Sequence, residues 1–216
     1  MSRPALLPLA AGILFISLLT GCAGAETTQS PSSTPRASSS ADAQTPTPTP
    51  APAEHTVAVS VDGISIDGGA LLSNRAPEDT LAALEQILGT RPEPEQPDPA
   101  YDIVFYDWGT VSASVLSGST VSLSFTASDV PGLTVVLANG IGLGSTRDEA
   151  MAAGAEPIWD EDGDGTADDV SIEHRDVPGT VSLANPGEVG VEYIQLTIAD
   201  DVVTGLSNGA NDFSDL

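Results

Sequence analysis

The chain has 216 residues, of which 31 are acidic and six are basic, all six arginines, so its formal net charge is −25. Such an acidic surface argues against binding nucleic acid, which needs cations to neutralise phosphates, and against lying on an anionic bilayer. The charge is compatible with a basic partner or with bound cations. It is equally compatible with a genome whose composition favours Ala, Gly, Asp and Arg, without any selection for a partner.

The first 22 residues predict an export signal that ends in a lipid anchor. After the cationic residues 1–3, an apolar stretch covers residues 5–19, which is shorter than the roughly 20 residues that span a bilayer. It ends in Leu19-Thr20-Gly21-Cys22, which resembles the lipobox of bacterial lipoproteins. The resemblance implies cleavage before Cys22 and transfer of a diacylglycerol to its thiol, and two acyl chains suffice for stable anchoring. We therefore expect lipidated Cys22 to hold the protein on the extracytoplasmic face of the cell membrane; the alternative is an ordinary secretory signal or a short uncleaved helix.

A tether follows the anchor. Residues 23–53 are almost entirely Ala, Ser, Thr, Pro and Gln and end in TPTPTPAPA. This composition cannot bury enough apolar area to offset the entropy of ordering, so we expect disorder, with the Thr-Pro run leaning toward polyproline II. A Ser/Thr/Pro stretch outside the membrane is also a candidate for O-glycosylation.

The first half of the head, residues 54–137, predicts strands around one helix. Val57 and Val59 alternate with smaller residues up to a tight turn at Asp62-Gly63, and a helix is expected from Pro77 until Gly89 ends it. After a proline-rich loop, alternating patterns predict strands in the segments 101–108, 110–115, 120–125 and 133–138.

The second half, residues 138–216, repeats this order. A glycine-rich turn precedes a short helix with Ser145 as its expected N-cap, ending near Gly154. Strands are expected at 170–174, 180–184, 191–198 and 202–207, with a hairpin turn at Asp200-Asp201. The shared order predicts an α+β fold of two tandem repeats, each a short helix on an antiparallel sheet.

The start of the second helix carries a further resemblance. Gly144-Ser145-Thr146-Arg147-Asp148-Glu149-Ala150, followed by Gly154 and Pro157, resembles a turn-helix signature of BamE/SmpA-type lipoprotein domains and β-lactamase-inhibitor-protein-like folds. The resemblance implies helices on one side of an antiparallel sheet, in tandem repeats for the inhibitor type. The disulfides of the inhibitor type cannot form, because Cys22 is the chain's one cysteine.

The segment DEDGDGTADD, residues 160–169, predicts a cation site. It resembles the DxDxDGxxD calcium loop of EF-hands and of certain β-hairpin repeats, which implies oxygen ligands from Asp160, Asp162, Asp164, the carbonyl of Thr166, and Asp168. Alternate carboxylates on a tightly coiled loop point inward, and Gly165 permits the sharp turn. Without a cation these carboxylates would repel one another.

The flanks of this loop favour a β-hairpin over an EF-hand. Ser171 stands where an EF-hand has its bidentate Glu, and neither flank has a helical pattern. We expect calcium to be structural and weakly bound, with a dissociation constant of about 10⁻⁴–10⁻³ M, as in extracellular modules. The alternative is a solvated acidic turn without an ion, since Asp and Gly are common turn residues.

Catalytic constellations are missing from the sequence. His55 is expected in the disordered boundary of the tether and His174 as a lone exposed residue, and no GxSxG, HExxH, CxxC or P-loop motif occurs. Of Tyr101, Phe105, Tyr106, Trp108 and Trp159 we expect most to serve the core, with binding of a partner as the alternative.

These features predict a protein that is not an enzyme. We expect a membrane-anchored surface lipoprotein whose head binds an unidentified protein or cell-envelope component, with calcium rigidifying one loop and no nucleic-acid partner. The alternative is an envelope-assembly scaffold or a secreted-enzyme inhibitor, as the turn-helix resemblance implies.

Overall fold

The computed structural model describes residues 54–126 and 132–214. All described residues belong to one compact unit, Thr49–Leu216. The expected signal peptide, Cys22 and the tether therefore lie outside the described residues. Within the described ranges, no helix is both long enough and apolar enough to cross a membrane.

The smaller of two sheets has four strands in the order β3-β2-β1-β7, comprising β1 (His55–Ser60), β2 (Gly63–Ile66), β3 (Leu72–Ser73) and β7 (Leu133–Leu137). The hairpin between β1 and β2 turns at the predicted Asp62-Gly63 position. Gly63 has φ +144°, and a Cβ there would lie 2.0 Å from the carbonyl oxygen of Leu72, so no other residue fits without rearrangement. β7 pairs with β1 in parallel.

The larger sheet has seven strands in the order β4-β5-β6-β11-β10-β9-β8, and every neighbouring pair is antiparallel. Its strands are β4 (Ile103–Asp107), β5 (Val111–Leu116), β6 (Thr120–Thr126), β8 (Glu156–Trp159), β9 (Asp169–Asp176), β10 (Val191–Ala199) and β11 (Val202–Asn211). The segment 180–184, which was expected to be a strand, lies instead in the loop between β9 and β10, so that prediction is wrong.

Two helices occur in the described part of the chain. α1 (Pro77–Leu88) begins at the predicted proline, and Gly89 follows its last residue with φ 95°. α2 (Arg147–Ala152) is capped by Thr146, which forms a capping box with Glu149. The expected cap, Ser145, is used otherwise: its hydroxyl accepts from Gly142 N–H and its carbonyl accepts a bond from β11.

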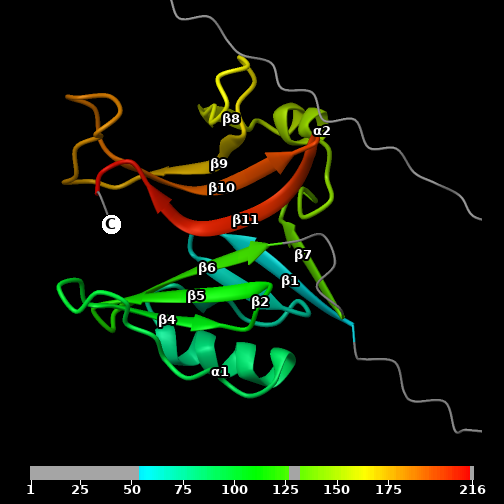
Figure 1. Ribbon diagram of the computed structural model, residues 1–216, viewed down its shortest axis with the longest axis vertical. Coiled ribbons are helices and arrows are strands. Elements are labelled where there is room, and N and C mark those ends of the chain that lie inside the picture. Colours follow the sequence, from blue (N-terminus) through cyan, green and yellow to red (C-terminus); the bar gives the residue numbers. More distant parts are fainter. Residues whose placement is uncertain (1–53, 127–131, 215–216) are drawn as a thin grey trace, which may run out of the picture. The chain divides into compact units, whose positions relative to one another are not determined.

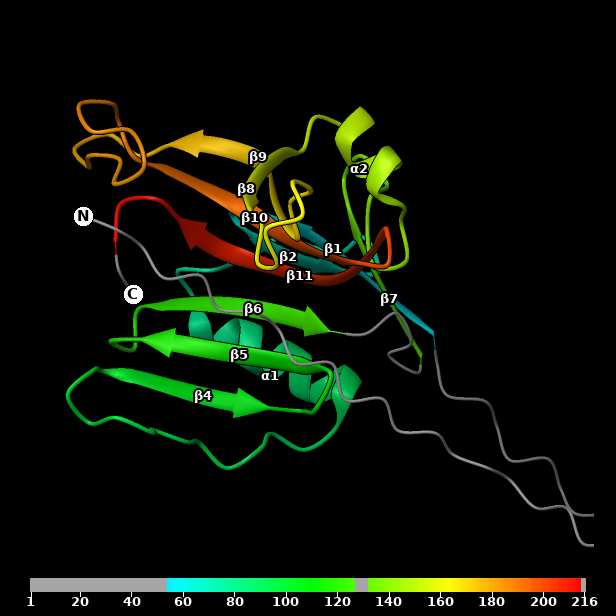
Figure 2. The same cartoon turned by 45° about the horizontal axis from the view of Figure 1, so that its top comes forward.

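The core lies between the two sheets and includes α1. Leu81 and Leu84 of α1 are fully buried, as are Val57 and Ile64 of the smaller sheet and Phe125 of the larger one. Figures 1 and 2 agree in placing β1 and β2 behind β6 and β11, with α1 beside β4–β6. One face of the larger sheet is therefore buried, whereas Ser112, Ser124 and Ser207 on its opposite face are half-buried.

The described part is thus mostly β-sheet with few helices, consistent with the expected α+β class. Two tandem repeats are not shown. The strands on either side of residue 137 join one seven-stranded sheet, because β6 of the first half pairs directly with β11 of the second. The parallel pair of β1 and β7 also departs from the purely antiparallel sheets that were expected.

Candidate metal centre

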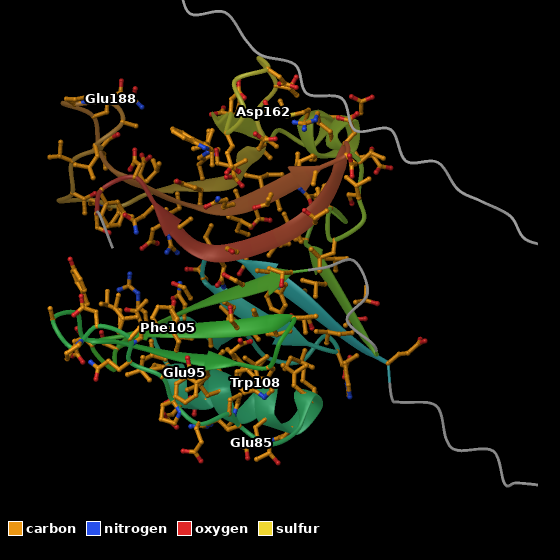
Figure 3. The ribbon with its side chains drawn as sticks, viewed as in Figure 1. Glu85, Glu95, Phe105, Trp108, Asp162 and Glu188 are labelled. Carbon is orange, nitrogen blue, oxygen red and sulfur yellow. The ribbon has the colours of Figure 1, made fainter. Side chains whose placement is uncertain are left out.

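The acidic segment forms the loop of a β-hairpin. β8 and β9 pair antiparallel on either side of residues 160–168, and Asp168 N–H donates to the carbonyl of Trp159 at 2.8 Å. Strands on both sides agree with a β-flanked loop rather than an EF-hand. Figure 3 shows Asp162 on this loop, beyond the end of β8.

The loop folds around its own carboxylates. The two oxygens of Asp160 accept from Gly163 N–H at 2.8 Å and Gly165 N–H at 2.9 Å. Gly165 takes φ 93°, which supports its expected role in the sharp turn. Asp168 Oδ2 accepts from Glu161 N–H at 2.7 Å and so closes the far end of the loop onto its beginning. Local backbone bonds therefore fix where the carboxylates point.

Three of the four predicted carboxylate ligands come together. Asp160, Asp162 and Asp168 each offer a carboxylate oxygen, and these oxygens lie within 4.8 Å of one another. Asp164 is not part of this group, and its Oδ1 accepts from Thr166 N–H at 2.7 Å. Asp164 and Thr166 nevertheless line, with Asp162 and Asp168, a surface hollow of about 360 Å³.

The positively charged side chain of Arg147 also lines this hollow. Nε of Arg147 donates to Asp201 Oδ1 at 2.9 Å, and its Nη1 donates to the carbonyl of Ala167 in the acidic loop. Asp201 belongs to the predicted turn between β10 and β11, where Asp200 and Asp201 have φ 51° and 60°. Arg147 thus ties the start of α2 to two acidic loops and offsets part of their negative charge.

The donor set fits a hard divalent cation. Calcium takes oxygen ligands at about 2.3–2.6 Å, so two ligands of one ion lie at most about 5.2 Å apart, and the 4.8 Å spread satisfies this limit. The group contains carboxylates alone, without the thiolates or imidazoles that typify zinc sites. These carboxylates are half-buried or exposed, which suits a weak site.

Each of the two histidines contacts one polar side chain. Nε2 of His174 lies 2.8 Å from Oγ of Ser171, a bond whose direction depends on the imidazole tautomer. Ser171 is 6% exposed, and its Oγ also lies 3.3 Å from the carbonyl oxygen of Glu156, so this pair is packed against the β8–β9 hairpin. His55 was expected to be disordered, yet it begins β1 and lies 2.7 Å from Asp67, and this bond lowers the pKa of that carboxyl.

The aromatic residues divide between core and surface. Tyr106 and Trp108 pack against the core, but they are two of the five, so the expectation that most of this group serves the core is wrong. Tyr101, Phe105 and Trp159 are 50%, 39% and 61% exposed, which leaves them available to a partner. Phe105 and Trp108 are labelled in Figure 3.

Comparison with known proteins adds no relative. No family model, no curated protein and no solved structure matches this chain. The resemblances at Cys22 and at Gly144–Ala150 therefore depend on those residues alone.

Proposed function

We propose that this protein is a membrane-anchored lipoprotein of the cell envelope whose β-rich head is a non-catalytic binding module stabilised by calcium. The anchor is supported by the residues 19–22, and the reach of the head by the tether. The one observation that carries the calcium site is the convergence of three carboxylates on a β-hairpin loop.

Calcium has a structural role in this proposal. Residues 160–168 form a long loop dominated by side chains that repel one another, and the chain cannot make an intrachain disulfide with its single cysteine. A cation held by Asp160, Asp162 and Asp168 would remove that repulsion and hold the ends of β8 and β9 together. Asp164 and Thr166 are the further oxygen donors at the same hollow.

A thermal unfolding series tests the calcium site. For a dissociation constant of about 10⁻⁴–10⁻³ M, 10 mM calcium adds about 1.4–2.7 kcal/mol, or about 3–10 °C in Tm. Magnesium at equal concentration should do less, because it demands near-octahedral geometry and dehydrates reluctantly.

Two variants sharpen this test. Asp162→Asn should abolish the calcium-dependent rise, whereas Asp176→Asn, at an exposed position at the end of β9 far from the loop, should retain it. If the Tm of the wild type does not change with calcium, or if calcium raises the Tm of both variants equally, the loop is a solvated acidic turn.

Membrane fractionation tests the anchor independently. Cys22→Ala should move the protein from the membrane fraction to the soluble fraction and abolish incorporation of labelled fatty acid. Unchanged membrane association of this variant would contradict lipidation at Cys22.

A specific feature of the topology favours the second candidate, an assembly scaffold or inhibitor built from tandem repeats. Each half runs from a helix into a meander of strands, α1–β4–β5–β6 and α2–β8–β9–β10–β11, and the last strands of the two meanders pair antiparallel. Two repeats of one helix-meander unit, related by an approximate two-fold rotation, would pair their last strands antiparallel in this way. Inhibition assays against secreted hydrolases test it: stoichiometric inhibition of any of them would favour this candidate over the first.

A further inference from the structure

A hollow of about 320 Å³ lies where β6 and β11 of the larger sheet separate. The backbones of these strands pair as far as Ser124 and Ser207, and Ser122 and Gly209, two positions further along the separating strands, both line the hollow. Asn74, which follows β3 of the smaller sheet, lines it as well. The hollow therefore reaches from the larger sheet to the smaller one, and a ligand could enter it without breaking a strand pair.

The side-chain carbonyl of Asn74 lacks a hydrogen-bond donor. Asn74 is 7% exposed, and its Nδ2 donates to the carbonyl of Val61 at 2.9 Å, which fixes the orientation of the amide because that carbonyl can only accept. Its backbone N–H and carbonyl are bonded to Asp62 and Val121. Oδ1 accepts from no residue in the described part of the chain. A nearly buried acceptor without a donor is unfavourable, so a group that donates to Asn74 in the hollow gains a hydrogen bond.

The local charge at the hollow is negative. Glu192 is the one charged residue that lines it, and its side chain is 20% exposed. Nη2 of Arg175 donates to Oε2 of Glu192, and Nη1 of the same guanidinium donates to Asp62 Oδ1. One cation shared by two carboxylates leaves this group with a net charge of about −1 and leaves Oε1 of Glu192 free of any donor among the described residues. The hollow therefore attracts a cation.

Apolar side chains form another part of the lining. Ile103 of β4 and Leu116 of β5 are direct cross-strand partners, and both line the hollow with Phe213. Leu116 is 38% exposed, so its apolar surface is accessible from this side. Aliphatic methylene groups that pack on these side chains leave water, as the stem of a lysine does when its charged end reaches a polar partner. The hollow thus combines acceptors for a charged group with a wall for an aliphatic stem.

We propose that this hollow binds a primary ammonium group on an aliphatic stem, which is the chemistry of a lysine side chain and of a free diamine. The three N–H donors of an ammonium match the free oxygens of Asn74 and Glu192. A guanidinium fits less well, because its planar fork pairs best with both oxygens of a carboxylate, and Arg175 already occupies Oε2 of Glu192. The net charge of −25 repels anionic ligands and adds to the attraction for a cation.

This inference rests on the proposed binding function of the head and names the chemistry of its partner. The test is an NMR titration of the ¹⁵N-labelled full-length chain with Nα-acetyl-lysine methylamide in the presence of calcium. We expect saturable shifts of the side-chain amide of Asn74 and of the backbone amides of Ser122 and Asn211. The Nε-acetylated form of the probe, which has the same stem without the charge, should produce none. Cadaverine is the second probe: if it binds more tightly than the lysine amide the source is a free diamine, and if more weakly it is a lysine side chain.

Two pairs of variants locate the contact. Ser114→Phe fills the hollow and should abolish the shifts, whereas Ser112→Phe, on the same face of β5 but outside the hollow, should bind like the wild type. Glu192→Gln removes the charge and should weaken binding at least about tenfold, whereas Glu188→Gln, an equal charge change in an exposed loop, should not. Circular dichroism and the Tm verify the fold of each variant, and if one pair does not fold, the other decides.

Three outcomes would overturn the inference: no saturable shift with either amine, shifts confined to the acidic loop at residues 160–168, or equal affinity of Ser114→Phe and Ser112→Phe. The calcium-dependent Tm of the same samples is measured in parallel. If it persists while neither amine binds, the ammonium site is wrong and the calcium-stabilised head stands. If calcium stabilisation fails while the amine binds in the hollow, the inference stands without the metal.

Discussion

Asn208 lies where the backbone pairing between β6 and β11 of the larger sheet is interrupted. It is 2% exposed, and its Oδ1 accepts from Leu123 N–H of β6 at 2.8 Å. Its Nδ2 donates to the carbonyl of Ser60 in the smaller sheet at 3.4 Å. One buried amide therefore replaces a backbone bond between β6 and β11 and also links the two sheets.

We predict that Asn208→Leu lowers the free energy of unfolding by about 1–3 kcal/mol. Leucine has a similar volume, so little cavity forms, but Leu123 N–H is left buried without an acceptor, and that desolvation cost sets the magnitude. The corresponding drop in Tm is about 2–4 °C per kcal/mol for a domain of this size. Urea unfolding followed by circular dichroism measures it, with Asn185→Leu in an exposed loop as the matched control.

Asn208→Asp gives a second, pH-dependent readout. The carboxyl keeps an acceptor for Leu123 N–H, but burial raises its pKa in the folded state above the unfolded value of about 3.9. The stability of this variant is then greatest below pH about 3.9 and is lost as the pH rises through the folded pKa. If Asn208→Leu equals its control, or the Asp variant shows the pH profile of the wild type, Asn208 does not join the sheets in this way.

Two further predictions concern backbone geometry. Thr146→Ala should cost about 0.5–2 kcal/mol by removing the capping box. The bond from Thr146 N–H lowers the pKa of Glu149 below its ordinary 4.5, so the contribution of Glu149 is complete above that pH and is lost as the pH falls through the folded pKa. Stability curves of the wild type and Glu149→Gln should therefore converge in acid, and parallel curves would contradict this contribution of Glu149. Gly63→Ala should cost far more than Gly68→Ala, because a Cβ at Gly63 meets the carbonyl of Leu72 whereas a Cβ at Gly68, with φ +71°, meets nothing within 4 Å. Equal losses, each about 1–2 kcal/mol, would mean that backbone strain alone sets the cost.

Features set by near neighbours could be predicted from the sequence. Pro77 and Gly89 bracket α1, and Asp200-Asp201 makes the turn between β10 and β11, as expected. The hairpin around residues 160–168 was equally predictable, because the alternating pattern after the loop and the Asp-Gly turn residues depend only on adjacent positions. The candidate ligands lie close together in the sequence, and three of the four predicted carboxylates converge.

Features set by distant contacts could not be predicted. Parallel and antiparallel strands share a period of two, so alternation at Val57 and Val135 does not reveal that β1 and β7 run in parallel. The segment 180–184 has a strand-like pattern, but its partners are irregular: Leu183 N–H donates to the carbonyl of Asp212, and Ser182 Oγ donates to the carboxylate of Asp212. That Ser112, Ser124, Ser207 and Gln195 are aligned across four strands also follows only from the strand register.

The proposed calcium site should weaken as the salt concentration increases. Its ligands are carboxylates whose field is screened over about 10 Å at 0.1 M salt, so the predicted calcium-dependent rise in Tm should shrink as sodium chloride increases. A basic protein drawn to the carboxylates of the head would lose affinity over the same range of salt concentration. A calcium-dependent rise in Tm that does not change with sodium chloride would contradict a site built from these carboxylates.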